Sequence, residues 1–208
     1  MWRRLGSSAL LGMVISLACL SAAQADTIEV GGVKYETVEQ VGGSKLPLNG
    51  AGVRYKAIFK VYTAGLYLPA KMNTAEQIYA ATTGPRRVHI VMLREIDANE
   101  LGKLFTQGME KNSPRDIFAK SINGTIKMAD MFSKRKKLVS GDSFTVDWLP
   151  GTGTLISVNG KVESEPIKEP EFYTALLSLW LGPSPADNLL KDALLGKARS
   201  SGRGGSDQ

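Results

Sequence analysis

The order in which strand-like and helix-like segments follow one another constrains the fold of this chain more than any other feature of its sequence. Runs of β-branched and aromatic residues come first, a helical block follows, strands return, and helices close the chain. The strand-like runs occupy residues 27–30, 33–38, 53–68, 87–93, 143–149, 154–158 and 161–163. Turn sequences such as Gly31-Gly32 and Asn159-Gly160 join neighbouring runs, which favours antiparallel pairing. The sequence therefore predicts one α+β domain in which a mostly antiparallel sheet packs against a layer of helices.

Two of these runs need a finer interpretation. Residues 46–52 are rich in glycine, proline and asparagine and are predicted to form a turn, and residues 53–68 then form two strands broken near residues 57–60. Residues 87–93 do not alternate cleanly between apolar and polar side chains, so this strand is predicted to be buried on both faces.

Four helices are predicted from start signals and apolar spacing. Asp97 and Glu100 form a capping box for a helix whose inward stripe is Leu101, Leu104, Phe105, Gly108 and Met109. A second helix begins at Ser113-Pro114 and turns Ile117, Phe118, Ile122 and Ile126 inward. Pro170 opens a third helix that runs to residue 181. The segment from Ser184 to Asp187 opens a fourth, which buries Leu189, Leu190, Ala193 and Leu194.

The first 25 residues have the pattern of a cleavable signal peptide. Arg3 and Arg4 precede an apolar stretch, and Ala23-Gln24-Ala25 supplies the small-x-small cleavage site, so cleavage is predicted after Ala25. The apolar stretch is shorter than the roughly 20 residues that span a bilayer, although an uncleaved anchor stays an alternative, as do twin-arginine export and lipidation at Cys19. We therefore expect a periplasmic or secreted protein, with a domain over residues 26–196 and a disordered tail over residues 197–208.

Composition excludes several classes of function for the mature chain. Removal of Arg3 and Arg4 lowers the formal net charge from +6 to +4, which is too mild to indicate a nucleic-acid partner. Cys19 is the only cysteine and His89 the only histidine, so neither a metal site nor Ser-His or Cys-His catalysis is expected, and a structural role is favoured for His89. The basic run at residues 134–137 marks either a solvated helix end or a contact with phospholipid head groups. No later segment is apolar enough to span a membrane, and the oligomeric state cannot be read from the sequence.

The motif Gly50-Ala51-Gly52-Val53-Arg54, followed by residues 59–68 (FKVYTAGLYL), resembles the chalcone isomerase family and is closest to its exported, bacterial branch. The resemblance covers roughly residues 27–195 and implies the family's open-faced sandwich of sheet and helices. It also implies a ligand cleft between the two layers, in which Arg54 faces the anionic oxygen of the ligand. From the residues alone, Arg54 has a competing interpretation as a solvent-facing strand residue beside Lys56.

The other polar groups that the family's isomerases use do not match this sequence. Tyr62 stands where the family has a threonine, and Thr63, one place away, is predicted to point to the opposite face. Leu101 and Gly108 stand at the positions of the helix tyrosine and asparagine, and Leu179 stands at the late polar position. Trp148, Phe172 and Trp180 are predicted either to line the cleft or to pack in the core.

The resemblance implies three hypotheses, none of which needs a cofactor. The first is an exported protein that binds a small hydrophobic acid, fatty-acid-like or phenolic, through Arg54 with help from Tyr62. The second is an intramolecular lyase of the chalcone-to-flavanone type, in which Arg54 is the catalytic residue that stabilises the phenolate. The third is a scaffold without a ligand. Residues 40–75 contain no acid, so an Arg54 that faced a cleft would lack a carboxylate nearby in sequence.

Overall fold

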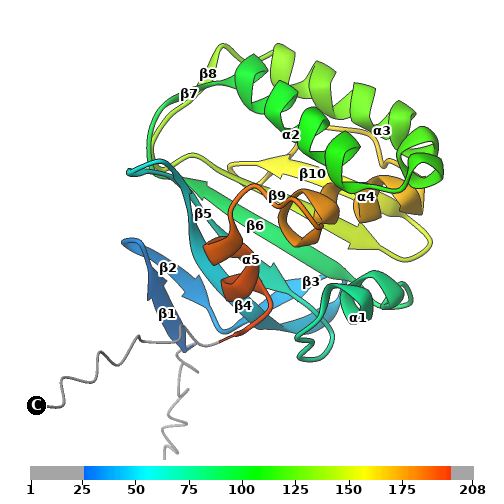
Figure 1. Ribbon diagram of the computed structural model, residues 1–208. Coiled ribbons are helices and arrows are strands. Elements are labelled where there is room, and N and C mark those ends of the chain that lie inside the picture. The colour runs from blue at the N-terminus through cyan, green and yellow to red at the C-terminus, as the bar shows by residue number, and fades with distance from the viewer. Residues whose placement is uncertain (1–25, 198–208) are drawn as a thin grey trace, which may run out of the picture.

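The computed structural model describes residues 26–197 and contains a seven-stranded antiparallel sheet (Figure 1). The strands are β1 (Thr27–Val30), β2 (Val33–Glu36), β3 (Val38–Val41), β4 (Ser44–Lys56), β5 (Phe59–Tyr67), β6 (Arg86–Met92), β7 (Ile96–Asp97), β8 (Lys137–Leu138), β9 (Ser143–Leu149), β10 (Gly153–Val158) and β11 (Lys161–Val162). The order across the large sheet is β11-β10-β9-β6-β5-β4-β3, while β1–β2 and β7–β8 form separate two-stranded ribbons. The predicted signal peptide and residues 198–208 of the predicted tail lie outside the described residues.

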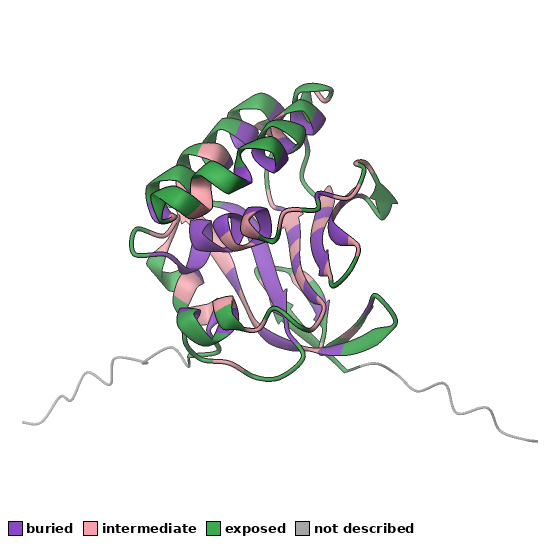
Figure 2. Cartoon of the chain, turned by 90° about the vertical axis from the view of Figure 1, so that its right-hand side faces the viewer, coloured by how far each residue is buried: buried purple, intermediate pink, exposed green. Residues whose placement is uncertain are grey.

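The helices cover one face of the curled sheet, as the predicted α+β class requires. They are α1 (Ala75–Ala80), α2 (Ala98–Asn112), α3 (Arg115–Ser133), α4 (Pro170–Leu181) and α5 (Asn188–Leu194). Helix α4 contacts both α2 and α3 on one side and β10 on the other, and its residues are mostly buried. Figure 2 shows buried residues gathered between the helices and the sheet, with exposed residues on the outer faces of the helices. Among residues 26–197, no helix is long and apolar enough to cross a membrane.

Strand β4 corrects the prediction of a turn at residues 46–52. The chain stays extended through this segment and pairs first with β3 and then with β5. A Cβ atom at Gly50 would lie 1.9 Å from the carbonyl oxygen of Ala193, and one at Gly52 would lie 2.7 Å from the Ala193 Cβ. The two glycines therefore allow α5 to pack directly on the strand backbone. In the sequence, a glycine needed for such a close contact looks the same as a glycine needed for a turn.

Helix boundaries were predicted better than the buried face of each helix. Asp97 caps α2 as predicted, because its Oδ1 accepts a hydrogen bond from the Glu100 amide at 2.9 Å. In α3 the predicted inward stripe is right only in part. Ile117 and Phe118 pack against the core, whereas Ile122 and Ile126 are 45% and 54% exposed. The α3 residues that are buried instead are Ser121, Gly124, Thr125, Met128, Met131 and Phe132. In α5, Leu189 is likewise exposed although its burial was predicted, and α1 was not predicted at all.

Strand β6 alternates more regularly than its sequence indicates. Arg86, Val88, Ile90 and Met92 are buried, and the residues between them are only partly buried. The predicted burial on both faces is therefore wrong, because the second face carries the charged residues Arg87 and His89. Arg86 precedes the run that was predicted as a strand, and its long side chain is buried against the rings of Trp148 and Tyr173.

Candidate functional site

A cleft of about 270 Å³ lies between the sheet and the helix layer, at the end of the sheet where β4 turns into β5. Its walls come from β4, β5, α2 and the segment that joins α4 to α5. Most of the lining is apolar and includes Val61, Ile96, Leu101, Phe105 and Leu179. A larger hollow of about 590 Å³ lies between α1, α4 and the α2–α3 connection, but neither Arg54 nor Tyr62 lines it.

Arg54 and Tyr62 are brought together by the pairing of β4 with β5. They are direct cross-strand partners, and a bulge in the register follows immediately between Arg54 and Tyr55. Such an irregularity re-aims side chains at the end of a sheet. Both residues line the cleft, so Arg54 does not simply decorate the solvent face.

The Arg54 guanidinium is half-buried and is only partly satisfied by the protein. It donates a hydrogen bond to the carbonyl oxygen of Tyr55. It forms no ion pair with any carboxylate of residues 26–197. The guanidinium also interacts with the Tyr62 hydroxyl beside it. It has five N–H donors, so most of its hydrogen-bonding capacity is not met by the described residues.

Tyr62 is a second donor with spare capacity. Its hydroxyl oxygen accepts a hydrogen bond from the Trp180 indole N–H at 2.9 Å, and it donates none to the described residues. Burial raises the pKa of Tyr62 to about 12, against the opposing effects of the Trp180 hydrogen bond and the Arg54 charge. The phenol is therefore protonated near neutral pH, and its O–H is free to donate to an acceptor beside Arg54.

Asp187 is the acid that the fold places close to this pair, and its oxygens are already occupied. Its Oδ1 accepts hydrogen bonds from the Leu189 and Leu190 amides at 2.7 and 3.2 Å, which caps α5. Its Oδ2 accepts a third from the Tyr55 amide at 2.8 Å. Asp187 thus fastens the start of α5 to β4 beside Arg54 without pairing with the guanidinium.

The three helix positions at which the isomerases carry polar groups are apolar in this cleft. Leu101, Gly108 and Leu179 all line it. A Cβ atom at Gly108 would lie 2.1 Å from the Leu179 Cδ1, so the leucine occupies the space that a larger residue at position 108 needs. Thr63 lies on the opposite face, as predicted, where it accepts a hydrogen bond from the Tyr35 hydroxyl at 2.8 Å.

Sequence reasoning missed several polar residues of the cleft, Lys111 and Asn112 among them, and overestimated its aromatic lining. Lys111 lines the cleft from the last turn of α2, next to Asn112, whose side chain bonds both the carbonyl and the amide of Ser184. Neither residue belongs to a recognisable motif. Trp148, Phe172 and Trp180 do not line the cleft and pack in the core instead.

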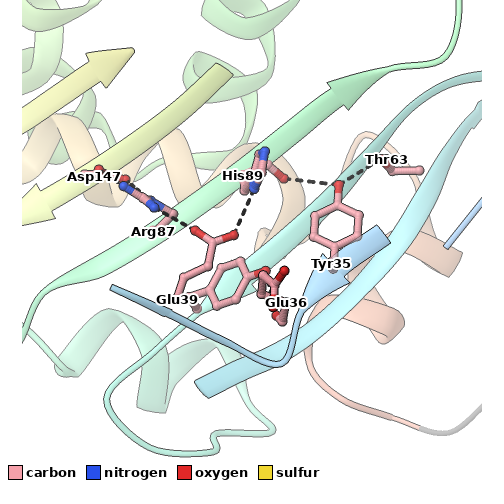
Figure 3. A network of polar contacts seen from close by, with 8 residues as sticks. Tyr35, Glu36, Glu39, Thr63, Arg87, His89 and Asp147 are labelled. Carbon is pink, nitrogen blue, oxygen red and sulfur yellow. Dashed lines mark hydrogen bonds and ion pairs between the residues drawn. The ribbon is translucent and has the colours of Figure 1, made fainter. Parts of the chain in front are cut away.

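A polar network on the other face of the sheet accounts for the only histidine of the sequence (Figure 3). The Glu39 carboxylate lies between Arg87 and His89, at 2.6 Å from Arg87 Nη1 and 3.0 Å from His89 Nδ1. Arg87 also pairs with Asp147, at 2.7 Å and 2.5 Å. Within residues 26–197 no cluster of three or more potential metal ligands occurs. The charged groups of the network pair with one another, and the network lines neither the cleft nor the larger hollow, which is the arrangement of a structural cluster.

Comparison with known proteins agrees with this architecture. A family model described as chalcone isomerase-like matches residues 27–196 of the chain. A crystal structure of a fatty-acid-binding protein from Arabidopsis thaliana superposes with a TM-score of 0.61 at 13% sequence identity, and the match covers 82% of this chain and 96% of the plant chain. At that identity the likeness establishes a common fold. No curated protein matches the chain in sequence.

Proposed function

Because this chain belongs to the chalcone isomerase-like family, we propose that it binds a small hydrophobic acid in the cleft between sheet and helices. The acid is fatty-acid-like or phenolic, and its anionic oxygen lies between Arg54 and Tyr62. The proposal includes export, with cleavage after Ala25, and a place in the family's exported bacterial branch. The mass of the protein recovered from the producing cells tests the cleavage site.

One observation carries this proposal. Arg54 is half-buried at the edge of an apolar cleft and has no carboxylate partner among residues 26–197. A charge withdrawn from water without a partner costs several kcal/mol, and a bound anion would offset that cost. Tyr62 adds a neutral O–H donor on the neighbouring strand, as a carboxylate or phenolate needs.

The size and lining of the cleft support the proposed class of ligand. A volume of about 270 Å³ lies just below the usual range for small-molecule sites, so the ligand is a single ring or a modest acyl chain. Leu101, Leu104 and Leu179 offer it an apolar wall, while Lys111 adds positive charge. The structural likeness to a fatty-acid-binding protein supports the same class of ligand.

Ring closure of a chalcone receives less support from this cleft. An isomerase must stabilise the enolate that develops during the reaction, and one such donor is typically worth about 10²–10³ in rate. The positions from which the family's isomerases supply these groups hold Leu101, Gly108 and Leu179. Arg54 and Tyr62 suit the binding of an anion better than its turnover.

The test is a ligand panel of medium-chain fatty acids and hydroxycinnamic acids, scored by native mass spectrometry and by the shift in melting temperature. We expect at least one acid to bind the purified mature protein. Arg54→Ala should weaken that binding by about 2–4 kcal/mol, since it removes a desolvated charge partner. Lys161→Ala on β11 removes one positive charge far from the cleft and serves as the matched control. If no acid binds, or if both variants weaken binding equally, the proposal is wrong.

A further inference from the structure

The turn that joins β4 to β5 holds two large apolar side chains in water. Ile58 is 84% exposed and Phe59 is 55% exposed. The turn is tight, and Ala57 adopts a left-handed conformation with φ 54°. Such turns are ordinarily built from glycine, asparagine and aspartate, so the backbone geometry does not call for these two side chains. No packing accounts for Ile58, and Phe59 has one face against a cation and is otherwise largely in water. A surface that exposes neighbouring large apolar groups indicates a contact with something outside the chain.

Positive charges surround this apolar tip. Lys56 and Lys60 flank it in sequence, and the Arg94 guanidinium lies 5.0 Å from the centre of the Phe59 ring. Neither Lys60 nor Arg94 forms an ion pair with any acid in the part of the chain that the structure describes. Lys56 has only a 3.7 Å contact with Glu100, between two exposed side chains.

The basic run at residues 134–137 belongs to the same end of the molecule. Arg94 precedes β7, which pairs with β8, and β8 starts within the basic run (Figure 1). Lys137 is paired with Glu95, and Arg135 with Glu163, whereas the exposed Lys134 and Lys136 form no ion pair within residues 26–197. The cleft opens at this end too, because both Lys56 and Ile96 line it.

We propose that this end of the protein docks on the surface of an anionic lipid bilayer. Ile58 and Phe59 enter the boundary between head groups and acyl chains, and Lys60, Arg94 and the free lysines of the basic run contact the anionic head groups. Apolar insertion combined with juxtaposed basic residues is how peripheral proteins hold a membrane surface. A docked molecule presents the mouth of its cleft to the bilayer, where hydrophobic acids partition.

The small size of the apolar tip argues against another protein, or a second copy of this chain, as its binding partner. A stable protein interface buries about 800 Å² on each side, with an apolar centre and few charges. Two side chains on a protruding turn, surrounded by cations, do not supply such a centre. They do match the small apolar depth and the negative charge of a bilayer surface.

Co-sedimentation with vesicles tests the proposal. The mature protein is mixed with vesicles of phosphatidylcholine alone or of phosphatidylcholine with phosphatidylglycerol. We expect binding to the second kind only, and weaker binding as salt is added, because the charges are exposed. The double variant Ile58→Asp/Phe59→Asp should bind about tenfold more weakly or worse, because it loses apolar insertion and gains repulsion. The matched control is Ile122→Asp/Ile126→Asp, which places the same two charges at exposed apolar positions on α3.

Three outcomes overturn the proposal. The first is that the wild-type protein binds neither kind of vesicle. The second is that the tip variant binds as well as wild type, and the third is that the α3 variant loses as much binding as the tip variant. Size-exclusion chromatography tests the alternative that the tip binds a second copy of the chain. A dimer formed by the wild-type protein but not by the tip variant would assign the tip to self-association instead. A thermal melt shows that both variants are folded. None of these readouts depends on a bound acid, so the docking and the proposed ligand stand or fall separately.

Discussion

Two arginines, on the strands that flank β5 on either side, show two different ways in which this fold surrounds a partly buried charge. Arg87 on β6 contacts two carboxylates, Glu39 at 2.6 Å and Asp147 at 2.5 Å. Arg54 on β4 contacts a backbone carbonyl and the neutral Tyr62 hydroxyl, pairs with no carboxylate of residues 26–197, and lines the cleft. Removing a charge from water is costly unless a partner replaces the lost hydration. The first arginine is therefore explained by the protein itself, while the second keeps unused donors, which is the basis of the proposed ligand site.

Glu39 makes the closed network sensitive to acid. Burial alone would raise the pKa of the Glu39 carboxyl group. Its hydrogen bonds with His89 and Arg87 outweigh that effect and lower the pKa from 4.5 to about 2. A group with a lowered folded-state pKa contributes stability that is complete above its ordinary pKa and is lost as the pH falls through the folded value. We expect urea denaturation to show a loss of about 3 kcal/mol between about pH 5 and pH 2 from this group.

Glu39→Gln is the control for that pH dependence. It removes the charge between Arg87 and His89 but keeps the shape of the side chain. The variant should be less stable than wild type at neutral pH and should lose less stability on acidification. Parallel stability curves for the two proteins between these pH values would contradict the assignment.

At the scale of elements, α5 positions the site by packing on β4. The helix lies against Gly50 and Gly52, and Asn49 donates to the Leu194 carbonyl oxygen at 2.7 Å, at the end of the helix. At the other end of the helix, Asp187 bonds the Tyr55 amide beside Arg54. The helix therefore bridges the glycine-rich part of the strand and the cleft, and its position sets the wall behind Arg54.

Gly50→Ala tests this contact. A methyl group there would collide with the backbone of α5, 1.9 Å from the Ala193 oxygen. We expect a loss of about 1–3 kcal/mol or more in the free energy of unfolding, measured with urea. Gly102→Ala on α2 is the matched control, because its Cβ would meet the Phe132 Cβ at 3.4 Å, an ordinary contact. That variant should be as stable as wild type or more so, since alanine favours a helix; a larger loss there than at Gly50 would refute the argument.

At the scale of the whole molecule, one fold carries a cleft whose chemistry depends on a few lining residues. The curled sheet and its helix layer are those of the chalcone isomerase-like family. The cleft keeps a cation on the first long strand, while its helix wall is apolar at Leu101, Gly108 and Leu179. A fold shared with an enzyme therefore does not establish a reaction for this chain.

The expected result of a chalcone assay follows from that lining. Ring closure removes the visible colour of the substrate, so its rate can be followed by absorbance. We expect the wild-type protein and Arg54→Ala to give the same rate as the spontaneous reaction, because the cleft lacks the donors that stabilise an enolate. An Arg54-dependent acceleration would establish the lyase instead of the binding protein.

The sequence alone determined the alternation of strand and helix blocks, the meander of β9 to β11, the cap of α2 and the family, although it missed α1. These follow from local periodicity, turn residues and capping chemistry, which act between neighbours in the chain. The sequence also paired Arg54 with Tyr62, through the motif of the family. Tertiary structure decided which faces are buried, and it exposed Ile122, Ile126 and Leu189 while it buried Arg86.

Only the fold could show that α5 packs against Gly50 and Gly52 and that the Leu179 side chain fills the space beside Gly108. Only the fold could bring the Ile58–Phe59 tip, Arg94 and the basic run to one end of the molecule. These are contacts between segments far apart in the chain, and such contacts depend on how whole elements pack. Whether a charge such as Arg54 has a partner is decided in the same way, by residues that the sequence places elsewhere.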